Sequence, residues 1–167
     1  MTELMYHTAR HFHLLEDGRG DYSIEIDPRT VTEKRVALLR WLGFNRASLG
    51  VQDLDPHVQK AINRIQPYEQ IRDVLGWLRD QGFQSINTDL IYGLPWQSET
   101  SLARTLERLL ELRPARISLF NYAHLPERFK TQRQINELAL PAADEKLRML
   151  VRAGSMLDKA GYVLIGV

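Results

Sequence analysis

Polar side chains recur near the carboxyl ends of the predicted strands, and their types suit a charged ligand that also carries hydroxyl groups. Asn87 and Asp89 are polar residues inside a predicted buried strand, SINTDLIYGLP, which Gly93 and Pro95 turn. A carboxylate there can hold hydroxyl or amino groups, and an arginine such as Arg64 can grip a carboxylate in bidentate fashion. The other candidates are Glu25, Asp27, Gln52, Asp53 and Asn121. This mixed set is expected to bind a zwitterion that carries a sugar.

Structural roles compete with this interpretation. Asp89 could equally tie down a loop amide, and Asp53 and Asp55 are more simply explained as caps of turns and helices. Arg64 alone is more simply a solvated helix end. Of the histidines, only His124 is a candidate for a site, because no HExxH or comparable metal-binding spacing is present.

Helices and strands alternate along the whole chain. The patterns predict five strands, at Asp21 to Asp27, Arg46 to Gln52, within Ser85 to Pro95, at Arg116 to Asn121 and at Tyr162 to Val167. Helices are expected at Glu3 to Phe12 with Thr2 as N-cap, after a Thr30–Glu33 capping box, from Asp55 to Asn63, around Ile71 to Leu78, after Ser98, and from Asp144 to Ala160.

Such alternation predicts an α/β fold with a parallel sheet and helices on its outside, as one domain over residues 1–167. Five strands are fewer than the eight of a closed barrel, so a partial (βα) barrel is expected. The first helix has no strand before it and the last strand runs into the chain end. The barrel is therefore expected to be truncated at both ends.

Composition narrows the functional classes. The chain has 167 residues and a net charge of +1, which gives no electrostatic case for nucleic acid or an acidic membrane surface. It lacks a long apolar run and a signal-peptide pattern, so a cytoplasmic location is expected. It contains no cysteine, which excludes a disulfide, a thiolate nucleophile or a thiolate-held cluster within these residues.

Four blocks of sequence resemble one enzyme family. YSIEIDPR, LGVQDLDPHVQKAINRIQ, NTDLIYGLPWQS and SLFNYAHLP are similar to the oxygen-independent coproporphyrinogen III oxidases, radical S-adenosylmethionine (SAM) enzymes of haem biosynthesis. The resemblance implies a radical SAM barrel and oxidative decarboxylation of coproporphyrinogen III to protoporphyrinogen IX. It also implies two SAM molecules, a [4Fe-4S] cluster and an electron donor.

The resemblance also implies roles for individual residues. Glu25 corresponds to a contact to the first SAM, and Gln52, Arg64, Asp89 and the backbone of Ala123 correspond to contacts to the second. Ile91 and Gly93 lie where such enzymes pass close to the adenosine.

The sequence departs from the family pattern in one respect. The family's CxxxCxxC and GGTP segments are expected upstream of Met1, and a substrate-covering region after Val167. The chain is therefore expected to be the middle of a catalytic domain, inactive alone and binding no cofactor tightly. Its bare strand edges, above all Tyr162 to Val167, are expected to pair with another chain, or else that segment is buried differently from the same segment in the complete protein.

Two other hypotheses remain at this stage. The chain could belong to the related radical SAM haem chaperone, although the FNYAHLP loop favours the oxidase. It could also be a metal- or sugar-binding partial barrel that uses Glu25, Asp27 and Asp89.

Overall fold

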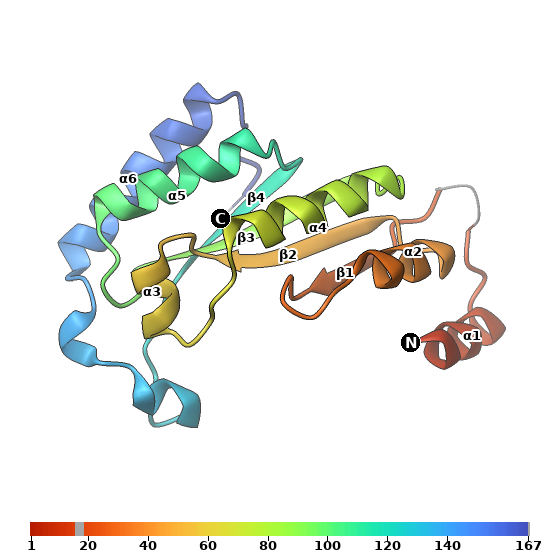
Figure 1. Cartoon of the computed structure of the whole chain (residues 1–167), viewed down its shortest axis with the longest axis horizontal. Coiled ribbons are helices and arrows are strands. Elements are labelled where there is room, and N and C mark those ends of the chain that lie inside the picture. Colours follow the sequence, from red (N-terminus) through yellow and green to blue (C-terminus); the bar gives the residue numbers. More distant parts are fainter. Residues whose placement is uncertain (16–18, 167) are drawn as a thin grey trace.

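Four parallel strands form the centre of the molecule (Figure 1). The computed structural model describes residues 1–15 and 19–166. The strands are β1 (Ser23–Ile26), β2 (Arg46–Gln52), β3 (Ser85–Tyr92) and β4 (Arg116–Asn121), and they lie in the sheet in chain order. The predicted parallel sheet is therefore confirmed, and the carboxyl ends of all four strands meet at one edge.

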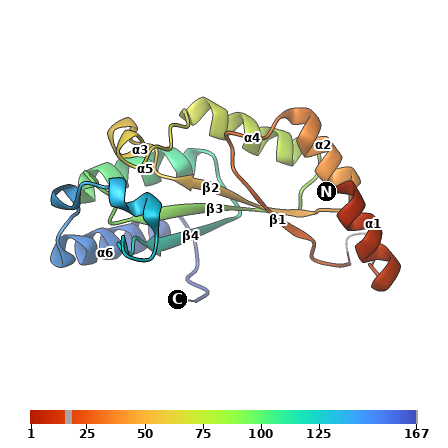
Figure 2. The ribbon, with the colours of Figure 1, turned by 90° about the horizontal axis from the view of Figure 1, so that it is seen from below.

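The helices follow the expected places closely. They are α1 (Thr2–His11), α2 (Glu33–Trp41), α3 (Pro56–Ala61), α4 (Tyr68–Asp80), α5 (Glu99–Glu111) and α6 (Ala143–Lys159), with short 3-10 helices η1 (Lys130–Gln134) and η2 (Glu137–Ala139). Figure 2 shows α2, α3, α4 and α5 on one side of the sheet. In the part of the chain that the structure describes, no helix is long and apolar enough to cross a membrane.

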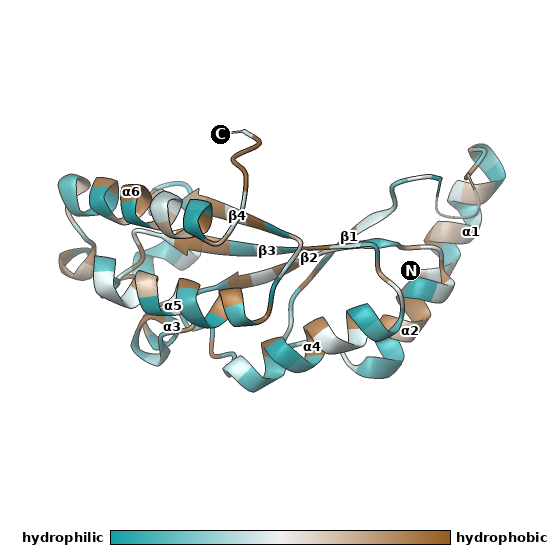
Figure 3. Ribbon diagram, turned by 90° about the horizontal axis from the view of Figure 1, so that it is seen from above, coloured by the Kyte–Doolittle hydropathy of each residue, from teal (hydrophilic) through white to brown (hydrophobic). Residues whose placement is uncertain are grey.

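The two faces of the sheet differ in polarity because side chains alternate along each strand. In β2 the residues Ala47, Leu49 and Val51 are buried under the helices, and the residues between them are only partly covered. β3 repeats the pattern with Ile86, Thr88 and Leu90 buried. Figure 3 shows hydrophilic and hydrophobic residues intermixed along these strands. The helix-covered face forms the core, which leaves the other face free for polar groups.

Helix starts are set by local capping. Asp55 accepts a hydrogen bond from the His57 N–H at the start of α3, and Ser98 forms a reciprocal capping box with Ser101 at the start of α5. These caps were predicted. The predicted Thr30–Glu33 box is wrong, because the Thr32 side chain caps α2. Thr2 is also not a cap; it is the first residue of α1.

The predicted fifth strand is not formed. Residues 162–166 lie outside the sheet, and Val167 lies outside the described residues. The Tyr162 hydroxyl donates to the Pro114 carbonyl (2.6 Å), but Val163, Leu164 and Ile165 are 82%, 85% and 79% exposed. A β-pattern gives a strand only where a neighbouring strand completes its hydrogen bonds, and here the apolar side chains find no partner surface.

A fully buried carboxylate just beyond β2 ties the carboxyl edge together. Asp53 Oδ1 accepts from the Asp55 N–H (2.6 Å) and from the Thr105 hydroxyl of α5 (2.8 Å). Its Oδ2 accepts from the side-chain amide of Gln97 (2.5 Å). Burial raises the pKa of the Asp53 carboxyl, while these three hydrogen bonds oppose the rise. Asp53 thus joins the end of β2 to α3, α5 and the loop after β3.

Gln97 extends the same network into the YGLPWQ loop. Its Oε1 accepts from the Gly93 N–H (2.6 Å) and the Leu94 N–H (3.3 Å), and its Nε2 also donates to the Ile91 carbonyl (2.9 Å). One buried amide therefore fixes the loop that follows β3, and Asp53 fixes that amide.

We expect Asp53→Asn to lower the free energy of unfolding by about 1 to 3 kcal/mol. Both carboxylate oxygens accept hydrogen bonds, so the new amide group must face a donor in either orientation. Urea denaturation followed by circular dichroism measures the loss. Asp80→Asn, at the exposed end of α4, is the matched control. A loss no larger than that of the control would show that Asp53 is not structural.

Candidate functional site

Asp89 is held on the open face of the sheet by Ser48 of β2 and Asn87 of β3. Its Oδ2 accepts from the Ser48 hydroxyl (2.7 Å) and its Oδ1 from the Asn87 amide (2.7 Å). Asn87 also lies 2.8 Å from the Ser48 hydroxyl and 3.1 Å from that of Ser118. The carboxylate therefore bonds across the sheet, and the alternative that Asp89 ties down a loop amide is wrong.

Gln52 and Arg64 converge on the same face above Gly50. A β-bulge shifts the register between Gly50 and Gln52, and Gln52 takes a φ of +63°. A Cβ on Gly50 would lie 2.8 Å from Gln52 Nε2 and 2.9 Å from Arg64 Nη2. Since Gly50 pairs with Asp89 in the sheet, their side-chain positions share a face. The structure thus brings three of the predicted residues together, with Gly50 as the floor between them.

The segment after α3 holds the bulge in place. Arg64 Nη2 donates to the Gly50 carbonyl (3.0 Å), and the buried Gln66 amide donates to the Gly50 carbonyl (3.3 Å) and to that of Val51. Arg64 is therefore not a solvated helix end. Two buried polar side-chain atoms in this region, Arg64 Nε and Gln66 Oε1, have no hydrogen-bond partner among the described residues. Burial lowers the pKa of the Arg64 guanidinium, so a further anionic partner would stabilise it.

Asp27 is occupied by guanidinium groups. Arg29 donates to both of its oxygens, at 2.7 to 3.2 Å, and Arg64 Nη1 lies 3.4 Å away. The Arg29 hydrogen bonds, opposed by burial, lower the pKa of Asp27 to about 2. A carboxylate saturated in this way makes a poor metal ligand. Among the described residues, no group of three or more His, Asp or Glu side chains could hold a metal ion.

Glu25 lies on the open face one step from this cluster. It pairs with Ser48 in the sheet, which pairs in turn with Asn87, and its side chain is exposed. The polar face therefore extends from Glu25 on β1 to Ser118 on β4.

The remaining predicted residues lie at the end of β3 and on the loops of the same edge. Ile91 and Gly93 are held by Gln97, and Ala123 follows the end of β4. The Tyr122 hydroxyl and His124 Nδ1 are 3.1 Å apart, and His124 Nε2 lies 3.1 Å from Glu137 Oε1. His124 thus bridges β4 to η2 at the site's edge.

Asp53 and Asn121 do not join the cluster. Asp53 is buried in the network described above, where its role is structural as the simpler interpretation held. Asn121 is exposed and pairs with Tyr92 at the end of the sheet.

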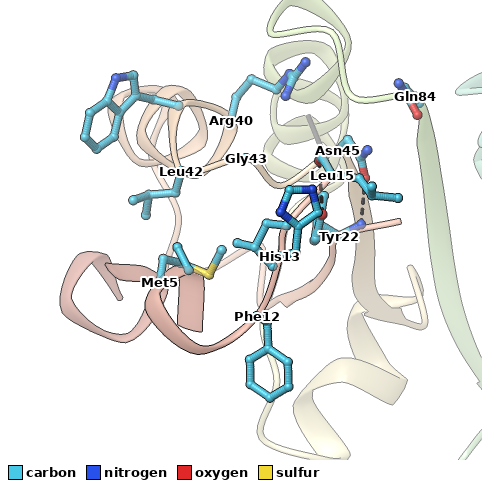
Figure 4. A pocket seen from close by; sticks show the side chains of 13 residues that line it. Met5, Phe12, His13, Leu15, Tyr22, Arg40, Leu42, Gly43, Asn45 and Gln84 are labelled. Carbon is cyan, nitrogen blue, oxygen red and sulfur yellow. Dashed lines mark hydrogen bonds between the residues drawn. The ribbon is translucent and has the colours of Figure 1, made fainter. Parts of the chain in front are cut away.

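A hollow of about 790 Å³ lies elsewhere, against α1 (Figure 4). Met5 of α1 and Phe12, which directly follows α1, line it on one side. Arg40 and Leu42 line it from the end of α2, and Asn45 accepts a hydrogen bond from the Tyr22 N–H. Asn45 directly precedes β2, so this hollow is at the amino-terminal edge of the sheet. None of the predicted site residues lines it, so its size does not make it the site.

Comparison with known proteins places the chain in a family. The family model that matches residues 3–109 describes the Radical SAM superfamily. The chain belongs to the radical SAM superfamily. It is 52% identical over 167 residues to the oxygen-independent coproporphyrinogen III oxidase of Pseudomonas aeruginosa, covering 100% of this chain and 36% of that relative. The Salmonella typhimurium oxidase is 46% identical with the same coverage.

A solved structure agrees with these relatives. The coproporphyrinogen III oxidase of Escherichia coli, described as a radical SAM enzyme, superposes with a TM-score of 0.94 at 43% identity, over 99% of this chain and 38% of that one. An archaeal Elp3 from Methanocaldococcus infernus, at 18% identity over 81% of this chain and 33% of its own, has a TM-score of 0.68 and shows a shared fold alone. The chain spans about a third of the length of the curated relatives it matches.

Membership of the radical SAM superfamily implies SAM and a [4Fe-4S] cluster, and the residues present fit only the first. The chain has no cysteine, so its side chains do not supply thiolate ligands to a cluster. The space over Gly50, by contrast, is lined by an amide, a guanidinium with an unpartnered buried Nε, and a carboxylate. These groups match the amino, carboxylate and ribose groups of SAM.

Sequence reasoning missed the residues that shape the site. Gly50, Gln66 and Gln97 were not singled out, and Ser48 and Ser118 were not connected to Asp89. The alternation of Ser48, Gly50 and Gln52 in RASLGVQ places all three on one face of a strand, which was the available signal.

The Asp27–Arg29 pair predicts a specific pH dependence. Because the folded-state pKa of Asp27 is lowered to about 2 from 3.8, its charged form stabilises the fold fully above about pH 5. That contribution is lost as the pH falls through the interval between these values toward 2. Asp27→Asn should therefore be less stable than wild type in urea at pH 6, with the difference shrinking toward pH 3. In an Arg29→Met background the difference should be much smaller; an equal difference there would contradict the assignment.

Proposed function

We propose that this chain is the central part of an oxygen-independent coproporphyrinogen III oxidase, and that its open sheet face holds two SAM molecules. The proposal rests on the convergence of Gln52, Arg64 and Asp89 over Gly50. It also rests on the 52% sequence identity to the Pseudomonas aeruginosa oxidase over all 167 residues. The reaction proposed for the complete protein is oxidative decarboxylation of coproporphyrinogen III to protoporphyrinogen IX, with an external electron donor.

The second SAM is assigned to the cluster around Gly50. Arg64 would bind its carboxylate, since the guanidinium already lies against the Gly50 carbonyl with a free buried N–H. Asp89 would accept hydrogen bonds from hydroxyl or amino groups, because Ser48 and Asn87 fix the directions of its oxygens. Gln52 would offer both a donor and an acceptor. Ala123, Ile91 and Gly93 would lie against the adenosine.

The first SAM is assigned to Glu25, whose exposed carboxylate can accept charge-assisted hydrogen bonds. When bound, SAM would supply the hydrogen-abstraction chemistry of the reaction. The residues of this chain bind and orient the ligands. The cluster that reduces SAM needs ligands from outside these residues, which have no cysteine. A cytoplasmic location and pairing through exposed strand edges stay predictions.

Two alternative functions, a metal-binding barrel and a haem chaperone, are tested by different observations. A metal-binding barrel that uses Glu25, Asp27 and Asp89 is disfavoured because Asp27 is held by Arg29 and Asp89 by Ser48 and Asn87. A haem chaperone shares the proposed SAM chemistry, and the experiment below separates it from the oxidase.

The full-length protein with a reconstituted cluster should convert coproporphyrinogen III to protoporphyrinogen IX under anaerobic conditions with SAM and a reductant. Product is measured by chromatography after oxidation to the porphyrin. Glu25→Gln should impair turnover, because loss of a charge-assisted hydrogen bond costs about 1.5 to 3 kcal/mol of binding. Transfer of haem to an acceptor protein without turnover would instead identify a chaperone, and neither activity would reject both.

Gly50→Ala should weaken binding of one of the two SAM molecules in the same full-length protein. The new methyl group would lie 2.8 Å from Gln52 Nε2 and 2.9 Å from Arg64 Nη2, so both side chains must move. We expect a loss of about tenfold or more in affinity at one site, measured by isothermal titration calorimetry. Gly76→Ala is the control: its Cβ meets open space within α4, so it should leave SAM binding unchanged and stabilise the fold slightly. Equal affinities in both variants would argue against a site over Gly50.

A further inference from the structure

Both peptide units that flank Ala123 are held by side chains from later in the chain. The Tyr122 carbonyl accepts a hydrogen bond from Lys146 Nζ of α6 (3.2 Å). The Ala123 carbonyl accepts from the side-chain amide of Gln132 in η1 (3.0 Å). The same Gln132 side chain accepts from the Leu125 N–H (2.5 Å). A segment with no regular secondary structure is therefore fixed residue by residue.

The planarity of the peptide bond fixes the direction of the Ala123 N–H. In a trans peptide the N–H points opposite to the C=O of the same unit. Since Lys146 holds the Tyr122 carbonyl, the Ala123 N–H is directed away from the Lys146 ammonium group. No hydrogen bond from this N–H is found within the described residues. The Ala123 N–H is thus a fixed donor, while the Ala123 carbonyl is already engaged by Gln132.

Lys146 reaches its position only because Gly93 has no side chain. A Cβ on Gly93 would lie 2.7 Å from Lys146 Cε and 3.1 Å from Cδ. The stem of Lys146 therefore crosses the glycine directly on its way to the end of β4. Within the described residues, no carboxylate forms an ion pair with Lys146. Its observed partner is the Tyr122 carbonyl.

The loop is held on its other side as well. The Tyr122 N–H donates to the Tyr92 carbonyl (2.8 Å), and His124 lies between the Tyr122 hydroxyl and Glu137. Three later segments, η1, η2 and α6, thus contribute one side chain each to a loop of four residues. Such convergence is what a preorganised ligand contact requires.

We propose that Lys146 and Gln132 are positioning residues that fix the Ala123 N–H as a hydrogen-bond donor to an acceptor atom of the second SAM. The inference rests on the proposed function, because it takes the second SAM as the ligand. It assigns the contact to the N–H of Ala123 rather than to its carbonyl. It also explains why residue 93 is a glycine: a side chain there would collide with the stem of Lys146.

Lys146→Met tests the hydrogen bond from Lys146 to the Tyr122 carbonyl, because the substitution keeps an apolar stem over Gly93 and removes the donor. In the full-length protein, affinity for one SAM molecule should fall about five- to tenfold, with the other unchanged. Lys146→Arg, which retains a donor, should restore much of the loss. Lys159→Met, at the far end of α6, controls for charge and should have no effect. Calorimetry with SAM alone gives both affinities without turnover.

Gln132→Glu independently tests the hydrogen bond from Gln132 to the Ala123 carbonyl. The carboxylate still accepts from the Leu125 N–H but offers no donor to the Ala123 carbonyl. Gln134→Glu makes the same charge change in η1 and is the matched control. Gln132→Glu should weaken the same SAM site as Lys146→Met. With SAM bound, hydrogen exchange at the Ala123 amide should be faster in both variants than in the wild-type protein.

The outcomes separate this inference from the proposed function. Two SAM molecules bound with wild-type affinities by both variants would overturn the inference and leave the proposed function standing. Equal weakening of both sites, or no rescue by Lys146→Arg, would show a general structural role and also overturn it. A wild-type protein that binds no SAM would overturn both.

Discussion

The buried carboxylate of Asp53 is the interaction on which the carboxyl edge of the sheet depends. A buried charge is costly unless it is hydrogen bonded, and Asp53 satisfies this condition only when Asp55, Gln97 and Thr105 are all in place. Gln97, which is held by Asp53, in turn holds the backbone of Ile91 and Gly93. The end of β2, the start of α3 and the loop after β3 are thereby set relative to one another before any ligand binds.

The bulge at Gly50 is the second constraint, and it converts a regular strand end into a site. In an unbroken strand, Gly50 and Gln52 would simply follow one another on one face. The extra residue and the positive φ of Gln52 bring its amide back over Gly50, where Arg64 also arrives. The Gln66 amide donates to the Gly50 and Val51 carbonyls at the bulge. The bulge is therefore held by hydrogen bonds within the chain.

Much of this fold follows from sequence patterns because the patterns are local. The alternation in RASLGVQ, the Asp55–Pro56 start of α3 and the Ser98 cap each reflect forces within a few residues. The site residues were placed partly by their position at strand ends and partly by resemblance to the oxidases. What failed or was missed depends on distant partners. The Tyr162 strand lacked a neighbour, the burial of Asp53 needed Thr105 from 52 residues away, and the passage of Lys146 over Gly93 has no local signal.

The charges around Arg64 show how a folded site can remain receptive to an anion. Asp27 is the nearest carboxylate, yet its oxygens are taken by shorter hydrogen bonds from Arg29, and Arg64 is left with a 3.4 Å contact. With Arg29 present, the guanidinium keeps its position through Gly50 but retains an unsatisfied buried N–H. A partly buried cation that is positioned but incompletely paired gains more from an anionic ligand than a solvated one, because part of its desolvation has already occurred in folding.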